Sequence, residues 1–329
     1  MIARSHAKLR KEQPTLAPPT ELDYLCAVDE FSRLGALRLR DTDGNYLAMA
    51  DDGKRTTPPV LELDHLYQAS RAFEKGEETA HDLQYLQGKG TSLGGMRPKC
   101  TIIDHDGTLA IGKFPSIDDQ RAVTRGEVLA MKLAQLAGID VARARIEMVD
   151  TTPVAVISRF DRTATFGRIP YLSAVSMLQA SRDEEHAYTE IVDVINSSCL
   201  AAKQDSQQLW RRLIFNLGFL HAGNGLWRLA PAFDLNPFPD KQRESKTWLS
   251  EVVGPISSID MLMNEAARFY LTPDEAVKVL REVLDAVSDW KTVAFSSEVG
   301  LTKKDIAAFA PAFEHHALEM AQSIVSNAA

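Results

Sequence analysis

The stretch RRLIFNLGFLHAGNGLWRLAPAFDLNP, residues 211–237, decides how the second half of this chain is interpreted. Its first residues continue a helical pattern, and a short strand begins at Gly218. The Asn224-Gly225 pair is a typical turn between two antiparallel strands, and the second strand leads to Asp234. A carboxylate at that place suits Mg²⁺, which takes one or two protein carboxylates together with phosphate oxygens. An Asx-turn or a helix cap at Asp234 is the alternative.

Composition limits the kind of protein. The 329 residues are 45% hydrophobic and 25% charged, which is typical of a soluble globular protein with one large or two medium domains. The net charge of -8 argues against a sequence-independent grip on nucleic acid, which needs a basic face. Three widely spaced cysteines predict free thiols, and no signal peptide or membrane-spanning run is visible, so we expect a cytoplasmic protein without membrane contact.

The order of predicted elements indicates the fold class. Strands with one helix come first, and helices dominate from about residue 171. The sequence therefore predicts an α+β fold with a strand-rich N-lobe, a helical C-lobe and a ligand cleft between them. The predicted elements are a hairpin in 34–48, a helix in 58–76, strands in 99–104 and 109–114 joined by a His105-Asp106-Gly107 turn, a helix in 118–138 closed by Gly138, strands in 144–150 and 153–160, helices in 171–180, 186–202 and 206–217, and a capped helix after Thr272.

A glycine-rich segment, Thr91-Ser92-Leu93-Gly94-Gly95, precedes the first of these strands. Backbone amides in such a turn can converge on phosphate oxygens because no side chain blocks the approach. The segment matches neither standard phosphate-loop pattern. A tight turn before the hairpin is therefore the alternative interpretation.

Two charged residues next to apolar positions are candidates for phosphate binding. Lys113 lies on the same strand face as Leu109 and Ile111, and Glu127 emerges beside an apolar helical stripe. Together they resemble the strand lysine and helix glutamate with which kinases hold phosphates. The alternatives are a lysine that extends from a strand end to solvent and an ordinary surface glutamate.

The run SRFDR, Ser158–Arg162, ends the last strand where the two lobes would join. A connecting strand there can present backbone amide and carbonyl groups to the edge of an adenine ring. A charged strand end without a ligand is the alternative.

Taken together and in this order, the segments TSLGGMRPK, LAIGKFP, RGEVLAMKLAQLAGI, SRFDR, LWRRLIFN and WRLAPAFDLNP resemble the HipA family over about residues 22–325. That family consists of serine/threonine kinases that act as toxins in bacterial toxin–antitoxin modules. The resemblance implies a two-lobed, protein-kinase-like fold, ATP and Mg²⁺ as cofactors, a DNA-binding HipB-like antitoxin as partner and a translation-related protein as substrate. The implied domains are a remnant of the N-terminal domain in 1–75, a kinase-like N-lobe in 76–162 and a helical C-lobe in 163–329.

The resemblance also implies roles for individual residues. Ser92 matches an autophosphorylated serine, whose phosphate would expel the loop from the site. Lys113 matches the phosphate lysine, with Glu127 as its helix partner, and Asp234 matches the metal aspartate. The implied nucleotide-binding residues are Ser92, Leu93, Gly94, Gly95, Lys113, Glu127, Arg159, Phe160, Asp161 and Phe233.

The sequence departs from the family pattern in two places. The resemblance implies that only the later part of the N-terminal domain is present, which puts its packing on the kinase core and its antitoxin contact in doubt. The family also has a loop of the form N-x-D-D-H-x-x-N-x between its FN and GFL segments, where the first Asp is the catalytic base and the last Asn binds metal. Here Phe215-Asn216 runs through Leu217 directly into Gly218, so the loop is absent. Gly218 could supply a sharp exit through a positive φ, and we expect disturbed packing nearby.

Three functional interpretations remain from sequence alone. The first is a kinase remnant with a nucleotide-binding cleft and little or no phosphotransfer. The second is a working kinase toxin that takes its base from elsewhere in the chain. The third is a non-catalytic protein that binds the antitoxin or a nucleotide, with its acidic surface facing a basic partner.

Overall fold

A computed structural model describes residues 6–7, 10–11, 13–48, 57–86, 97–181, 184–213, 217–239 and 247–328. The chain divides into two compact units. Unit 1 comprises Met1–Gln120 and Ile146–Pro170, and unit 2 comprises Arg121–Arg145 and Tyr171–Ala329. The predicted division at residues 75 and 162 stays a prediction.

Unit 1 is built around a four-stranded antiparallel sheet with the order β1-β2-β4-β3. The predicted β1–β2 hairpin is present, with Ile103 opposite Leu109 across the Asp-Gly turn. Strand β3 of this sheet begins at Ala144, and its first two residues belong to the stretch assigned to unit 2. The elements are α2 (Glu21–Cys26), η2 (Val60–Glu62), α3 (Leu63–Lys75), α4 (Ala80–Leu86), β1 (Lys99–Ile103), β2 (Leu109–Lys113), β3 (Ala144–Val149) and β4 (Thr152–Ser158).

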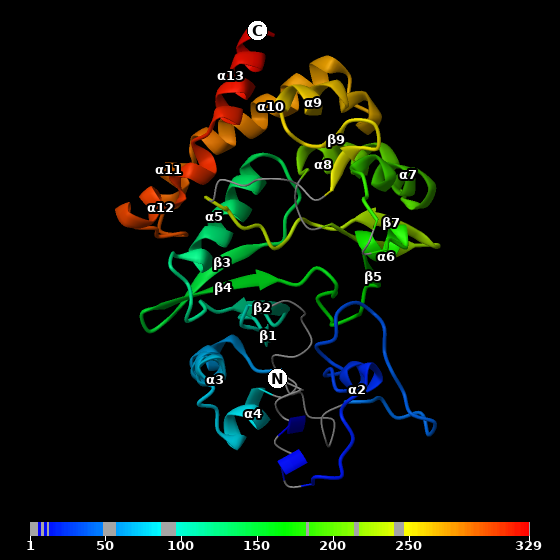
Figure 1. The fold of residues 1–329 in the computed structure, drawn as a ribbon, viewed down its shortest axis with the longest axis vertical. Coiled ribbons are helices and arrows are strands. Elements are labelled where there is room, and N and C mark those ends of the chain that lie inside the picture. Colours follow the sequence, from blue (N-terminus) through cyan, green and yellow to red (C-terminus); the bar gives the residue numbers. More distant parts are fainter. Residues whose placement is uncertain are drawn as a thin grey trace. The chain divides into compact units, whose positions relative to one another are not determined.

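The core of unit 1 lies between this sheet and helix α3 (Figure 1). Leu63 and Leu66 of α3 pack with Ile102 of β1 and Val154 of β4, and each is at most 2% exposed. The helix ends at Gly76, whose φ of 74° gives the left-handed cap that glycine adopts at little cost. Burial of one apolar helix face against the sheet therefore fixes the hairpin that carries Lys113.

Unit 2 is mainly helical and contains two small sheets. Strands β5, β6 and β7 form one antiparallel sheet, and β8 pairs with β9 in the other. The elements are α5 (Val123–Leu136), β5 (Tyr171–Ser173), α6 (Ala174–Leu178), α7 (Tyr188–Ser198), α8 (Ala202–Arg211), β6 (Gly218–Gly223), β7 (Leu226–Leu229), β8 (Trp248–Ser250), β9 (Gly254–Pro255), α9 (Ile259–Asn264), η3 (Ala266–Phe269), α10 (Pro273–Ser288), α11 (Trp290–Phe295), α12 (Lys303–Phe313) and α13 (His316–Asn327).

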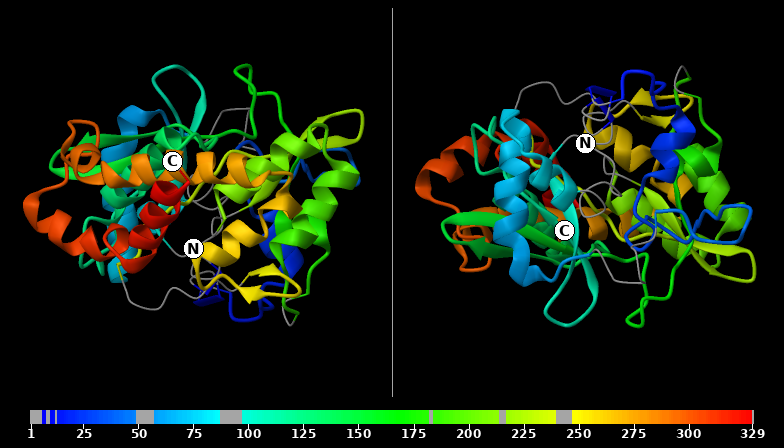
Figure 2. Two further views of the ribbon diagram at one scale, coloured as in Figure 1. Left: turned by 90° about the horizontal axis from the view of Figure 1, so that it is seen from above. Right: turned by 90° about the horizontal axis from the view of Figure 1, so that it is seen from below.

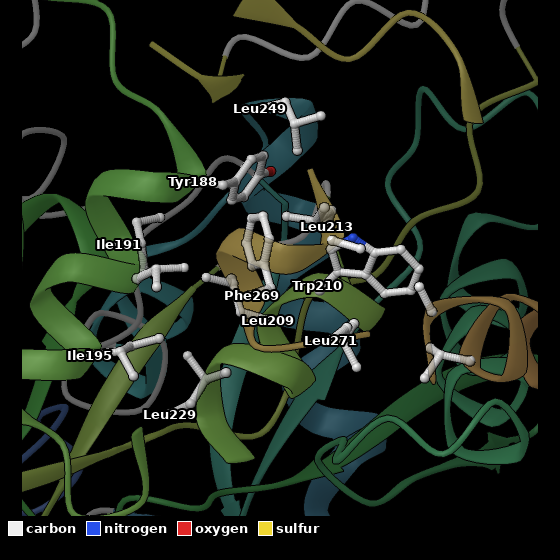
Figure 3. Packing of buried hydrophobic residues seen from close by; sticks show 14 of the residues in the cluster. Tyr188, Ile191, Ile195, Leu209, Trp210, Leu213, Leu229, Leu249, Phe269 and Leu271 are labelled. Atoms are coloured by element: carbon white, nitrogen blue, oxygen red, sulfur yellow. The ribbon is translucent and has the colours of Figure 1, made fainter. Parts of the chain in front are cut away.

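The main core of unit 2 is shown in Figure 3. Residues from α7 and α8 converge on Phe269, which is fully buried, and Leu229 of β7 closes the cluster from below. Trp210 of α8 packs at the other side and donates its indole N–H to the carbonyl of Leu262 at 3.2 Å. The polar end of this large side chain is therefore satisfied inside the core, as a buried tryptophan requires.

Helix α10 begins where its sequence predicts. The amide of Glu275 donates to the Thr272 side chain, and the amide of Thr272 donates to the Glu275 carboxylate at 2.8 Å. The helices α10 and α13 run side by side (Figures 1 and 2), with Leu280 and Leu284 packed against Ala321. This pairing buries part of the apolar stripe of α10, and Ala276 and Val279 pack in the main core of unit 2.

Two sequence expectations about secondary structure are wrong. The segment predicted as a helix in 171–180 begins as strand β5, because Tyr171 and Ser173 pair with Leu220 and Gly218 of β6. The helix predicted in 206–217 ends earlier, at Arg211. Across the described part of the chain, no helix is long and apolar enough to cross a membrane.

Candidate functional site

Asp234 follows a segment whose backbone is fixed by hydrogen bonds to both the amide and the carbonyl of Ala232. The amide of Ala232 donates to the carbonyl of Asp140 at 2.7 Å, and its carbonyl accepts from the amide of Ala142 at 3.0 Å. Leu235, immediately after Asp234, is fully buried. Asp234 itself is exposed. A fixed backbone therefore presents a carboxylate to solvent.

The backbone of Asp234 has a φ of 58°, in the left-handed region that side chains other than glycine seldom adopt. Such conformations cluster at functional sites because the surrounding structure must hold them in place. The amide nitrogen of the Asn236 side chain lies 3.3 Å from the Asp234 carbonyl and 3.4 Å from its Oδ1. Residues 235–239 contain no helix, so the interpretation of Asp234 as a helix cap is wrong.

Phe233 lies beside a second aromatic ring. Its ring meets that of Tyr171 edge to face, with 6.4 Å between the ring centres. Gly218 also packs against Tyr171, because a Cβ on Gly218 would be 2.4 Å from that ring. Position 218 therefore requires glycine because the Tyr171 ring leaves no room for a side chain. The expected positive φ at Gly218 is wrong, since its backbone belongs to strand β6.

The end of α8 buries an arginine before the chain reaches β6. Arg212 is 2% exposed, and its Nη1 donates to the carbonyl of Ala230 at 2.7 Å. Its Nε and Nη2 have no hydrogen-bond partner in the structure. Burial lowers the pKa of Arg212 to about 10, although the charges of Asp140 and Asp205 act to raise it. Residues 214–216, where the family's loop would begin, lie outside the described part.

Lys113 ends strand β2 and is partly buried. It lies opposite Lys99 on one side and Ala155 on the other. The neighbouring Gly112 allows close packing, since a Cβ there would be 3.1 Å from Leu63 of α3. Both interpretations of Lys113, phosphate binding and extension to solvent, agree with its partial burial.

Glu127 lies on α5 and is only 4% exposed. Its neighbours Met131 and Ala134 on the same helix are buried as well. The interpretation of Glu127 as a surface residue is therefore wrong. Because Glu127 belongs to unit 2 and Lys113 to unit 1, their pairing stays a prediction.

In the predicted connector, the side chains of Arg159 and Asp161 take part in buried hydrogen bonds within unit 1. Arg159 makes two hydrogen bonds to Asp161, at 2.8 and 2.6 Å, and both residues are buried. Arg162 adds a third bond to Asp161 at 2.8 Å, and the amide of Gly35 a fourth at 2.7 Å. Burial raises the pKa of Asp161, but the bonds from Arg159, the charge of Arg162 and the Gly35 amide outweigh it, so the pKa lies below the ordinary value.

Part of the connector's backbone is also engaged. The amide of Arg159 donates to the carbonyl of Leu109, and the carbonyl of Asp161 accepts from the amide of Ile169. A contact with an adenine edge would have to come from the backbone groups near Phe160 that lie between these two bonds. That contact stays a prediction.

The glycine-rich loop lies outside the described residues. Ser92, Leu93, Gly94 and Gly95 therefore keep only their predicted roles, and the described chain resumes at Arg97, directly before β1. Within the ranges that the structure describes, no group of three or more His, Cys, Asp or Glu side chains is placed to hold a metal ion. A magnesium ion held by one carboxylate and by phosphate oxygens would not need such a group.

Sequence reasoning missed two polar residues near Asp234. Asn236 follows Asp234 by two positions, and its Oδ1 is buried without a hydrogen-bond partner. Arg212 is buried beneath the segment that leads to Asp234. An oxygen-bearing side chain two residues after a candidate metal ligand was a signal that could have been used. Nothing in the apparent helical run LWRRL distinguished Arg212 from its neighbour Arg211.

Comparisons with known proteins agree on family and fold. The HipA-like C-terminal domain family matches residues 91–291. The HipA protein of Shewanella oneidensis MR-1, solved with HipB and its operator DNA, superposes with a TM-score of 0.61 over 98% of this chain and 81% of that chain, at 13% identity. The Helicobacter pylori proinflammatory kinase CtkA superposes with a TM-score of 0.50 over 72% of this chain and 95% of that chain, also at 13% identity.

These solved structures confirm the predicted α+β, kinase-like fold. At such low identity, they carry no information about substrate or activity. Among curated proteins, none matches this sequence.

Proposed function

We propose that this chain, which belongs to the HipA-like family, is a kinase-like protein. It binds Mg–ATP and transfers the γ-phosphoryl group slowly or not at all. The observation that carries this proposal is the connection between α8 and β6. Helix α8 ends at Arg211 and β6 begins at Gly218, and the intervening residues Arg212–Leu217 include no carboxylate and no histidine.

In this proposal, nucleotide binding depends on a small set of residues. Lys113 binds phosphate oxygens, and Asp234 holds Mg²⁺, which neutralises phosphate charge when bound. Glu127 orients Lys113, Phe233 lies beside the nucleotide, and the loop with Ser92 covers the phosphates. The exposed carboxylate of Asp234 on a fixed backbone supports the metal role. The partial burial of Lys113 in a rigid hairpin supports the phosphate role.

Slow chemistry follows from the missing proton acceptor. A general base contributes about 10²–10⁴ in rate to a reaction of this kind. His221 is the first titratable side chain after the connection, and its ring packs edge to face on Trp227 with 5.4 Å between centres. That packing places His221 within the β6–β7 hairpin, so it does not substitute for the lost base.

A thermal-shift experiment tests nucleotide binding. The full chain is melted with and without ATP and Mg²⁺, alongside the variants Lys113→Ala and Asp234→Asn. We expect stabilisation of the wild type and loss of that stabilisation in both variants. Wild-type melting that is unchanged at millimolar Mg–ATP would refute the proposed binding.

A labelling experiment tests the chemistry. The chain is incubated with γ-labelled ATP and Mg²⁺, and label at Ser92 is compared with the Ser92→Ala and Asp234→Ala variants. We expect no label on the wild type. Label that both substitutions abolish would show a working kinase, and a protein of the translation machinery would then be tested as substrate.

Partner binding is a second candidate function. It is favoured by the similarity over 98% of this chain to a HipA protein solved with HipB and operator DNA. The net charge of -8 suits a basic, DNA-binding partner. Co-purification with a HipB-like antitoxin, and weakening of that complex by salt, would support this function. Failure to co-purify at low salt would exclude it.

A further inference from the structure

The side chain of Asn236 lies beside Asp234 and is poorly satisfied. Its amide nitrogen makes only two long contacts, 3.3 Å to the Asp234 carbonyl and 3.4 Å to Asp234 Oδ1. Its Oδ1 is buried and has no hydrogen-bond partner in the structure. A buried polar atom without a partner is rare in folded proteins and often marks a missing ion or water. One end of this amide is therefore weakly held and the other is not held at all.

The amide can reverse its two ends at little cost. Its oxygen and nitrogen have nearly the same size, so a half-turn about the last side-chain bond leaves the packing unchanged. In either orientation the inner position holds a polar atom without a partner. The outer position therefore decides the orientation, and its neighbours are two oxygen atoms of Asp234. An N–H faces these oxygens in the absence of a cation.

A divalent cation would reverse that preference. With the amide turned, three oxygens lie together: the carbonyl and Oδ1 of Asp234 and the Oδ1 of Asn236. The outer amide position is 3.4 Å from Asp234 Oδ1. Two oxygens at right angles around Mg²⁺ are about 2.9 Å apart, given Mg–O distances of about 2.0–2.1 Å. A shift of about half an ångström, within the reach of two side chains, would bring both oxygens onto one ion.

We infer that Asn236 is the second protein ligand of the divalent cation that Asp234 binds, an inference that rests on the nucleotide- and metal-binding function proposed above. Asn236 supplies a neutral oxygen to the ion and comes from the same segment as the carboxylate. The connection Arg212–Leu217 need not then contribute a ligand.

The test uses Mn²⁺ as the probe. The full chain is titrated with Mn²⁺, and the electron paramagnetic resonance signal of the free ion reports binding. We expect Asn236→Ala to weaken Mn²⁺ binding by about tenfold or more, as loss of groups around a metal typically does. We expect Asn236→Asp, which keeps the side-chain shape and adds charge, to bind Mn²⁺ more tightly than the wild type.

Asn264→Ala is the matched control, because Asn264 is exposed at the end of α9. It should bind Mn²⁺ as the wild type does. If Asn236→Ala and Asn236→Asp both bind as the wild type while Asp234→Asn loses the ion, the inference is wrong and the proposed function stands. Absence of Mn²⁺ binding by the wild type overturns the inference too, whereas the Mg–ATP thermal shift judges the proposed function separately.

Discussion

Arg159 and Arg162 of unit 1 differ from Arg212 of unit 2 in how many of their hydrogen-bond donors are used. In unit 1, the Nε, Nη1 and Nη2 of Arg159 donate to Asp161, Thr101 and backbone carbonyls, and Arg162 shares the same carboxylate. In unit 2, Arg212 makes one hydrogen bond, to the Ala230 carbonyl, and two of its nitrogens have no partner. All three arginines are at least nine-tenths buried.

The difference shows that a buried charged side chain does not stabilise the fold by its burial alone. Removing charges from water costs several kcal/mol per ion, and only a full set of hydrogen bonds offsets that cost. The Asp161 carboxylate accepts four hydrogen bonds, so its removal would leave the charges of Arg159 and Arg162 buried without their partner. Arg212 makes one hydrogen bond and leaves two nitrogens without a partner, so we expect its guanidinium to contribute little to the stability of the fold.

The largest expected effect comes from Asp161→Asn. The change would remove the negative charge between Arg159 and Arg162 and leave both cations buried. We expect a loss of about 3–5 kcal/mol in the free energy of unfolding, measured by urea titration at neutral pH. Asp118→Asn, at an exposed position in the same unit, should change it by no more than about 0.5 kcal/mol. Equal effects of the two variants would contradict the structural role of Asp161.

A matched pair of substitutions tests the comparison directly. Arg162→Met would leave Asp161 with one arginine fewer and would leave several carbonyls without the N–H groups that they accept from. We expect a cost of about 3 kcal/mol or more in the free energy of unfolding. Arg212→Met would lose one hydrogen bond and remove two unpartnered nitrogens, so its effect should lie within about 1 kcal/mol of zero. A loss for Arg212→Met as large as that for Arg162→Met would show that unseen partners satisfy Arg212.

A smaller effect is expected from Gly218→Ala. The carbonyl of Gly218 accepts from the amide of Ala230, whose own carbonyl binds Arg212. A new Cβ would press on the Tyr171 ring at 2.4 Å, and such overpacking costs about 1–3 kcal/mol. The double variant with Tyr171→Ala should recover part of this loss in thermal melting. Unchanged stability of the single variant would mean that the Tyr171 ring moves freely.

The smallest effect is expected at Asp205, whose pH dependence should be opposite to that of Asp161. Burial raises the pKa of Asp205, and its bonds from Arg228 offset this only in part. Its stabilising contribution is therefore present below the unfolded value of 3.8 and is lost as pH rises through the raised folded pKa. At pH 7, Asp205→Asn should change the free energy of unfolding by about 1 kcal/mol or less.

Asp161 behaves in the reverse way. Its folded pKa is lowered, so its contribution is present above 3.8 and is lost as pH falls through the folded value. Urea titrations between pH 3 and 7 should show an acid loss of stability in the wild type that Asp161→Asn reduces and Asp205→Asn does not. The same acid profile in both variants would contradict this assignment.

Local patterns in the sequence predicted the fold well. The Asp-Gly turn predicted the hairpin of β1 and β2, and Thr272 predicted the start of α10, because both signals act within a few residues. The strand at Tyr171 was missed because its pairing with β6 depends on residues far along the chain. Propensity favoured a helix there, and tertiary pairing overrode it.

The candidate site was predictable only in part. Asp234 stays a predicted metal ligand, and it was selected because a carboxylate after a hairpin is visible in the sequence. The use of Arg159 and Asp161 could not be foreseen, since their partners at Ser32 to Gly35 lie more than a hundred residues earlier. The burial of Arg212 was equally invisible, because it depends on where α8 ends.

The segment before residue 36 therefore has a practical meaning for anyone who prepares fragments of this protein. A fragment that begins at Ala36 would retain every strand of the unit 1 sheet. It would nevertheless lack the carbonyls of Phe31, Ser32, Arg33 and Gly35 that receive the N–H groups of Arg159 and Arg162. Such a fragment should express as aggregated material, although its apparent domain is intact.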